Sequence, residues 1–117
     1  MSPKDHDVDL LPGTLDLMVL GVLRAGPDHG YAIARRIERA SRDAIGVEEG
    51  SLYPALHRLE REGLLQSNWD TAESGRRRKY YRITAKGKKA LEKRRAEWEE
   101  FSVGVNGVLG MPHHGVV

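Results

Sequence analysis

Hydrogen-bond donors gather on one short stretch of this chain. Ser51, His57, Arg58 and Arg61 carry hydroxyl, imidazole and guanidinium groups, and Tyr53 adds a phenolic hydroxyl. Such groups bind phosphate oxygens and the edges of nucleic-acid bases. The chemistry that this stretch offers is therefore recognition of a polyanion.

A helix over residues 51–62 would hold these donors on its outer side. Leu52, Leu56 and Leu59 recur at steps of four and three, which places them on one helix face. A short helix with small and basic residues near its N-terminal end is suited to entering the major groove of DNA. The same pattern is also typical of an ordinary amphipathic core helix with solvated charges, so the neighbouring segments must decide.

Three residues set the expected limits of this helix. Ser51 is expected as the N-cap, because its hydroxyl can accept from a free backbone N–H. Pro54 then lies in the first turn, where its missing N–H costs little. Gly63 follows the last polar residues and is a natural C-terminal stop.

The charges of the chain are distributed unevenly. The net charge is only +2, yet residues 76–95 hold eleven Lys or Arg and one acid, Glu92, which leaves eight basic and sixteen acidic residues elsewhere. A cationic block on an otherwise acidic chain favours nucleic acid as the partner. The alternative is a solvated helix surface whose charges are unpaired.

The residue types do not favour catalysis, a metal site or a membrane span. The 117 residues suit one compact domain, and there is no cysteine. The five histidines are scattered without metal-ligand spacing, no apolar run approaches the length of a membrane span, and the first residues lack the order of a signal peptide. We expect a cytoplasmic protein that is not an enzyme and uses no metal or cofactor.

Two amphipathic helices are expected before the donor-bearing stretch. The first begins near Gly13 or Thr14 and has an apolar stripe formed by Leu15, Met18, Val19, Val22 and Leu23. The second covers residues 30–41, and its outer face is expected to carry Arg35, Arg36, Glu38 and Arg39. Residues 42–49 are expected to hold a two- or three-residue strand. Helix, short link and helix outline a helix-turn-helix.

After Gly63 the apolar period changes from 3.6 to 2, which predicts a β-hairpin. Residues 65–70 alternate as a half-buried strand, residues 80–83 form its partner, and residues 71–78 form a polar tip. A basic hairpin after a helix-turn-helix is the wing of a winged helix, and its cations would reach a phosphate backbone or a minor groove. The alternative is a flexible charged loop. The cations are Arg76, Arg77, Arg78 and Lys79.

A long last helix is predicted over residues 85–109, with Thr84 as its cap. Leu91, Trp98 and Val105 are seven residues apart, and Phe101 lies between the last two, which makes a short seam of coiled-coil type. Such a helix at the end of a small domain is a candidate for dimer contact. Its three glycines from residue 104 to residue 110 are expected to fray its end.

Four motifs together resemble the PadR-like transcriptional regulators, in the form that has a single C-terminal helix. They are Leu-Pro-Gly-Thr-Leu-Asp at 11–16, His-Gly-Tyr at 29–31, Gly-Ser-Leu-Tyr-Pro-Ala-Leu at 50–56 with Leu-Glu at 59–60 and Gly-Leu at 63–64, and Gly-Arg-Arg-Arg-Lys-Tyr-Tyr at 75–81. The resemblance covers residues 11–101, and the glycine-rich end of the last helix departs from the family pattern.

The resemblance implies a fold that is mainly α with a small β-hairpin, a winged helix-turn-helix followed by a long C-terminal dimerisation helix. The expected organisation is a flexible N-terminus at 1–9, the DNA-binding domain at 10–84, the dimerisation helix at 85–109 and a disordered tail at 110–117. It implies a repressor that binds a two-fold operator in double-stranded DNA as a homodimer. The alternative function is a winged-helix module for protein or RNA contact without operator recognition.

The expected roles of the residues follow from this interpretation. The DNA-binding residues are Ser51, Tyr53, Pro54, His57, Arg58, Arg61, Arg76, Arg77, Arg78 and Lys79. Tyr53 has the alternative of a ring packed beneath the helix. The dimerisation residues are Leu91, Trp98, Phe101 and Val105. Some members of the family hold flat aromatic compounds between helices of the dimer, so Trp98 either stacks on such an effector or fills the dimer seam.

Overall fold

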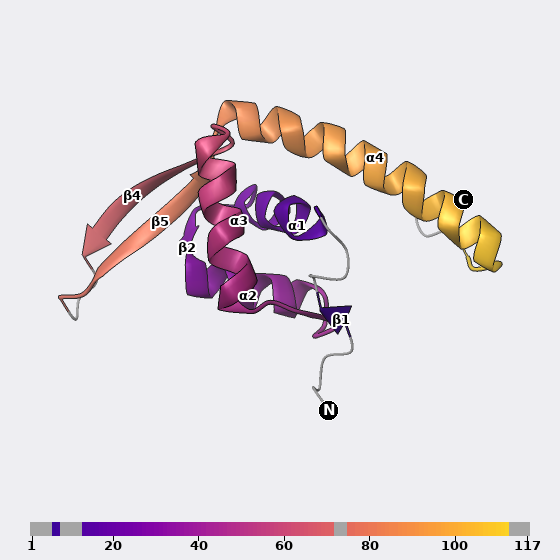
Figure 1. The fold of residues 1–117 in the computed structure, drawn as a ribbon, viewed down its shortest axis with the longest axis horizontal. Coiled ribbons are helices and arrows are strands. Elements are labelled where there is room, and N and C mark those ends of the chain that lie inside the picture. Colours follow the sequence, from indigo (N-terminus) through magenta and orange to yellow (C-terminus); the bar gives the residue numbers. More distant parts are fainter. Residues whose placement is uncertain (1–5, 8–12, 72–74, 113–117) are drawn as a thin grey trace.

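The computed structural model describes residues 6–7, 13–71 and 75–112, and it shows a winged helix-turn-helix with one long additional helix (Figure 1). The helices are α1 (Thr14–Leu23), α2 (Gly30–Ala40), α3 (Glu49–Arg61) and α4 (Ala85–Leu109). The strands are β1 (His6–Asp7), β2 (Asp28–His29), β3 (Ile45–Gly46), β4 (Leu65–Thr71) and β5 (Arg77–Ile83). The mainly α fold with a small β-hairpin is confirmed.

The core lies between α1, α2 and α3 and under the base of the hairpin. The apolar stripe of α3 supplies its centre, because Leu52, Leu56 and Leu59 have no exposed surface. Burial of each such side chain contributes about 1.5–3 kcal/mol. The same burial turns the opposite side of α3 towards solvent.

The hairpin belongs to a three-stranded antiparallel sheet with the order β2-β5-β4. β4 pairs with β5 along its whole length, from Leu65 opposite Ile83 to Thr71 opposite Arg77. β2 pairs only with Tyr80 and Tyr81. β2 could not be predicted from the sequence, since a two-residue strand is too short to show alternation.

The ends of α3 differ in part from the prediction. The N-cap is Glu48, so the prediction that Ser51 caps the helix was wrong, and Pro54 lies in the second turn and not in the first. Gly63 ends the helix as predicted. Gly63 has φ 78°, and its N–H donates to the backbone carbonyl of Glu60. The next N–H, from Leu64, donates to the backbone carbonyl of Leu59. These two bonds form a Schellman motif.

The link between α2 and α3 is fixed by a buried carboxylate. Glu38, which we expected on the outer face of α2, is buried and accepts from the Val47 N–H at 3.0 Å. Arg35 lies 2.6 Å from the other oxygen of the same carboxylate. The helical period predicted that Glu38 is exposed. A periodic pattern within α2 cannot show that the link after this helix folds back and covers the face that carries Glu38.

The short strand predicted in this link is present as β3, and it pairs in parallel with β1. The pairing brings His6 and Asp7 of the N-terminal segment to the domain. The predicted flexibility of the rest of residues 1–9 lies outside the described residues, as does that of residues 113–117 in the tail.

α4 begins at a tight junction with the hairpin and then leaves the domain (Figure 1). Thr84 caps the helix as predicted, since its hydroxyl accepts from the Gly87 N–H at 3.0 Å. The helix continues through Gly104 and Gly107 to Leu109 and ends at Gly110, which has φ 72°. The expected fraying from Gly104 onward is therefore not seen.

Substitution of Gly87 by alanine tests the junction between α4 and the hairpin. A Cβ at this position would overlap the Leu64 carbonyl oxygen and lie 2.7 Å from Cγ1 of Ile83. We expect Gly87→Ala to lower the free energy of unfolding by about 2–3 kcal/mol, measured by urea denaturation. The control is Gly21→Ala in α1, which lies away from the proposed dimer face and where no atom lies within 4 Å of the new Cβ. It should raise stability by about 0.5–1 kcal/mol, and equal effects of the two variants would contradict the tight junction.

Candidate nucleic-acid interface

The outer side of α3 carries the residues that the sequence predicts to bind DNA. Tyr53, Pro54, His57, Arg58 and Arg61 are exposed. Ser51 is half-buried in the first turn. The structure thus brings all six residues of this part of the prediction to one helix, five of them on its exposed surface.

Arg58 is held in an ion pair with α1. Its Nη2 lies 2.6 Å from Oδ1 of Asp16, and its Nε donates to Oδ2 of the same carboxylate at 3.2 Å. The hydrogen bond to Asp16 is the main cause that raises the pKa of Arg58 above its ordinary value. Any contact of Arg58 with DNA, which the sequence predicts, would require the guanidinium to share or leave this carboxylate.

The ring of Tyr53 packs against the first residue of α2, as the alternative interpretation of this residue stated. A Cβ added at Gly30 would lie only 2.7 Å from the Tyr53 hydroxyl oxygen and Cε1. Tyr53 keeps 36% of its surface exposed, so the residue lies at the edge of the domain. Position 30 therefore requires glycine, because any side chain there would collide with the ring of Tyr53.

The cations of the wing have different partners. β5 begins at Arg77, so Arg77 and Arg78 lie in the strand and not in the predicted tip. Successive strand residues point to opposite faces. The Arg77 guanidinium lies 4.7 Å from the ring centre of Trp69, which is exposed and not half-buried as its alternation predicted. Nη1 of Arg78 lies 3.1 Å from Nε2 of His29.

The wing is fastened to α3 through Glu60. The Ser67 hydroxyl donates to this carboxylate, and Nζ of Lys79 lies 3.5 Å from its other oxygen. Tyr81 is buried beside them, and burial is the main cause that raises its pKa. These contacts fix the distance between the exposed side of α3 and the base of the wing.

The basic block of residues 76–95 is divided in space. Its C-terminal part lies on α4, where Lys86 donates to the Glu62 carbonyl at 2.9 Å and Arg94 pairs with the Glu62 carboxylate at 3.9 Å. Cations are favourable at this place because it is the negative end of α3. Only the wing part of the block, from Arg76 to Lys79, lies near the start of α2 and near Tyr53 of α3.

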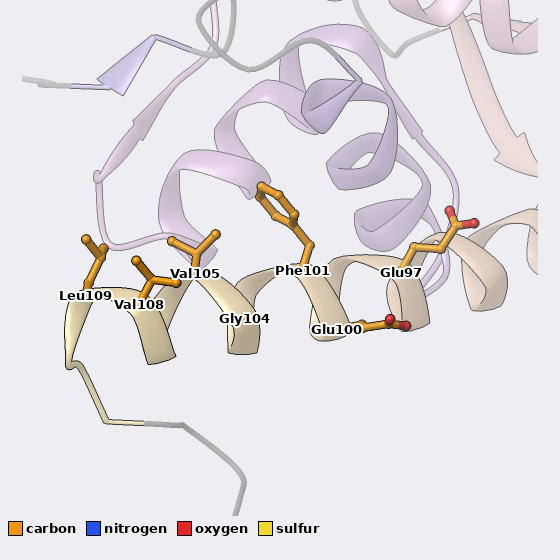
Figure 2. A pocket seen from close by; sticks show the side chains of 7 residues that line it. All are labelled: Glu97, Glu100, Phe101, Gly104, Val105, Val108 and Leu109. Atoms are coloured by element: carbon orange, nitrogen blue, oxygen red, sulfur yellow. The ribbon is translucent and has the colours of Figure 1, made fainter.

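The second half of α4 presents an apolar face to solvent. Trp98 is 43%, Phe101 64% and Val105 38% exposed. A groove of about 730 Å³ runs along this face, and Figure 2 shows Phe101, Val105, Val108 and Leu109 lining it, with Glu97 and Glu100 towards the start of the helix. Leu91, in contrast, is buried in the core of its own domain and has no surface left for a partner. The predicted dimer seam is corrected accordingly and begins at Trp98.

Neither a membrane-spanning helix nor a metal-binding cluster is present among the described residues. None of the helices among them is long and apolar enough to cross a lipid bilayer. Within the same residues no group of three or more His, Asp or Glu side chains is arranged to hold a metal ion.

The comparisons with known proteins agree on one family. The model of the Transcriptional regulator PadR-like family matches residues 19–93. Transcriptional regulator Rv3488 of Mycobacterium tuberculosis is 39% identical over 88 residues, which are 75% of this chain and 81% of that protein.

Solved structures lead to the same family. A transcriptional regulator from Clostridium thermocellum superposes with a TM-score of 0.76 at 33% identity, covering 85% of this chain and 96% of that chain. A PadR family transcriptional regulator from Eggerthella lenta has a TM-score of 0.72 at 39% identity, with 87% of both chains covered. The chain belongs to the PadR-like family of transcriptional regulators. It is a DNA-binding regulator and not an enzyme.

A double-mutant cycle on Asp16 and Arg58 measures how firmly α3 is held by α1. We expect Asp16→Ala and Arg58→Ala to be non-additive by about 1 kcal/mol in urea unfolding, because the pair is bidentate and Asp16 is nearly buried. The control cycle uses Glu92 and Arg95, an exposed pair one turn apart on α4. It should couple by only about 0.3 kcal/mol. A coupling of Asp16 with Arg58 no larger than the control would contradict the proposed anchoring.

Proposed function

We propose that the protein is a repressor that binds a two-fold operator as a homodimer, with α3 in the major groove and the wing along the backbone. The observation that carries the proposal is the exposed donor surface of α3 beside a cationic wing, with both elements joined through Glu60. In this arrangement Ser51 and the start of α3 approach phosphates, while His57 and Arg58 are the candidates for base edges, Arg58 by sharing or leaving the carboxylate of Asp16. Such a repressor acts in the cytoplasm.

The apolar face of α4 supports the dimer. Exposed apolar surface of this extent marks an interaction site on a small domain, and Trp98, Phe101 and Val105 follow the spacing of a helix–helix seam. Two-fold pairing through this face would present two copies of α3 together. We expect half-sites about one helical turn apart, roughly 34–36 Å.

The alternative, a module for protein or RNA contact, makes a different prediction about sequence preference. Selection of bound fragments from a random duplex pool, at a stated salt concentration, should enrich a palindrome if the protein is an operator-binding repressor. Equal competition by unrelated duplex would favour the alternative. Arg77 and Trp69 would serve either function, so their exposure does not distinguish the two.

Substitution of Arg77 by alanine tests the contact between the wing and the backbone. Each phosphate that a cation neutralises steepens the plot of log affinity against log salt by about one unit. We expect Arg77→Ala to flatten that slope by about one unit, measured by fluorescence anisotropy over a salt series. Arg95→Ala on α4 serves as the control and should leave the slope unchanged. An unchanged slope in folded Arg77→Ala would remove this side chain from the contact surface.

Release by a flat aromatic effector is the last part of the proposal. It is supported by a groove of about 390 Å³ between α1 and α4, which is lined by Leu17, Gly21 and Trp98 among others. Planar aromatic compounds that bind there should quench tryptophan fluorescence in the wild type and in Trp69→Ala, but not in Trp98→Ala. If Trp69 accounts for all of the quenching, Trp98 only fills the dimer seam.

A further inference from the structure

A cationic cleft lies where the end of α1, the base of the wing and the start of α4 come together. Its volume is about 470 Å³. Each of the three elements contributes one cation to its lining, and these are Arg24 just after α1, Arg82 of β5 and Lys88 of α4. Gln66 of β4 and Pro27 also line it, and the described residues of this lining include no carboxylate.

The cleft exists because the chain leaves the edge of β5 at this point. β2 pairs only with Tyr80 and Tyr81. Pro27, which precedes β2, has no N–H with which to continue the ladder. Within the described residues, Arg82 and Ile83 therefore have no strand beside them on that side of β5, and both line the cleft.

The polar residues that the wing contributes to the cleft point away from α3. Ser67 and Lys79 contact Glu60 of α3. Side chains alternate between the two faces of a strand, and Gln66 is paired with Arg82 in the hairpin. Gln66 and Arg82 thus lie on the face opposite to α3, separate from the donor surface proposed to bind DNA.

Two of the cations lack a carboxylate partner. Nη2 of Arg82 donates to Oε1 of Gln66 at 3.0 Å, which is a neutral acceptor. A guanidinium has five N–H donors, so most of those of Arg82 remain for a ligand. Lys88 forms no ion pair with any residue in the described part of the chain.

The nearest acids do not neutralise the cleft. Glu92 lies 4.0 Å from Arg24, but the same oxygen lies closer, at 3.1 Å, to Arg95. Asp28, the neighbour of Pro27 in the chain, pairs with Arg36 at 3.4 Å. The cleft therefore keeps an excess of positive charge.

We propose that this cleft binds a small anion with two or more negative charges, a phosphate ester or a polycarboxylate. Each guanidinium can hold two oxygens of such an anion, and Lys88 adds a third cation. The volume of the cleft lies in the range of small-molecule sites. The inference does not rest on the proposed function, because it requires neither DNA nor a dimer.

An anion held by all three cations would join α1, the wing and α4. It would fix the angle at which α4 leaves the domain, close to the junction capped by Thr84. The cations come together only in the folded chain, so the anion should raise the midpoint of thermal unfolding as its concentration increases.

The first experiment titrates the chain with inorganic pyrophosphate in an isothermal calorimeter. One anion per chain should bind, and Arg82→Gln and Lys88→Gln should each weaken binding by on the order of tenfold, because a charge-assisted contact is lost. Lys93→Gln is the control, since it removes the same charge from α4 outside the cleft and should bind as the wild type does. Equal weakening by Lys93→Gln would show that only net charge matters and would overturn the inference. Arg24 is left unchanged because it also borders the groove beside Trp98.

The second experiment supplies the cleft with an anion of its own. Gln66→Glu places a carboxylate where the amide oxygen now accepts from Arg82. This variant should keep the contact and remain folded, but it should lose pyrophosphate binding. Asn68→Asp adds the same charge two residues further along β4, outside the cleft, and should retain binding. Undiminished binding by Gln66→Glu would overturn the inference.

The third experiment identifies the source of the anion. Glycerol 3-phosphate and citrate are titrated separately while the NMR signals of the Arg82 and Thr84 N–H groups are followed. Saturable shifts with glycerol 3-phosphate support a phosphate ester, and those with citrate support a polycarboxylate. Acetate at equal ionic strength should cause no saturable shift, and equal shifts with acetate would overturn the requirement for more than one charge. If duplex DNA alone shifts these signals and displaces pyrophosphate, the cleft holds the DNA backbone and the assignment to a small anion is overturned.

Discussion

Burial of the apolar stripe of α3 is the constraint on which the rest of the structure depends. Leu52, Leu56 and Leu59 have no exposed surface, so α3 cannot rotate about its axis without bringing apolar side chains into water. That fixed rotation is what places Tyr53 and His57 together on the outside. The donors of this helix are exposed to a ligand only because its opposite face is fully buried.

The family motifs gain a physical meaning from contacts between distant segments. Gly30 of the His-Gly-Tyr motif is small because Tyr53 of the next motif lies against it. Asp16, the last residue of the first motif, forms an ion pair with Arg58 of α3, the proposed recognition helix. These pairs orient α3 before any ligand arrives, which reduces the entropy that binding must overcome.

The elements of the fold could be predicted from the sequence where a local signal exists. Periodicity identified the helices and the hairpin, Gly63 marked the end of α3, and Thr84 was correctly predicted as the cap of α4. Errors occurred where a distant partner decides. Glu38 is buried because Val47 and Arg35 satisfy its carboxylate.

The site could be predicted only as a set of residues and not as a geometry. The sequence shows that Arg77, Arg78 and Lys79 are adjacent, but β5 separates them onto two faces and gives them different partners. The pairing of β5 with β2 could not be predicted, because β2 has too few residues to leave a pattern. Leu91 lies seven residues before Trp98 and so fits the predicted dimer seam. It is nevertheless buried in the core, because this part of α4 still packs against the domain.

In Figure 1 the wing and the apolar second half of α4 lie at opposite ends of the long axis. DNA on the wing and a second chain on α4 can therefore be bound at the same time. The most direct measurement is the number of chains bound to one selected operator duplex, obtained from the molar mass of the complex by analytical ultracentrifugation. Two chains on a single palindrome are predicted. One chain per duplex, or the same mass with unrelated DNA, would contradict the central claim.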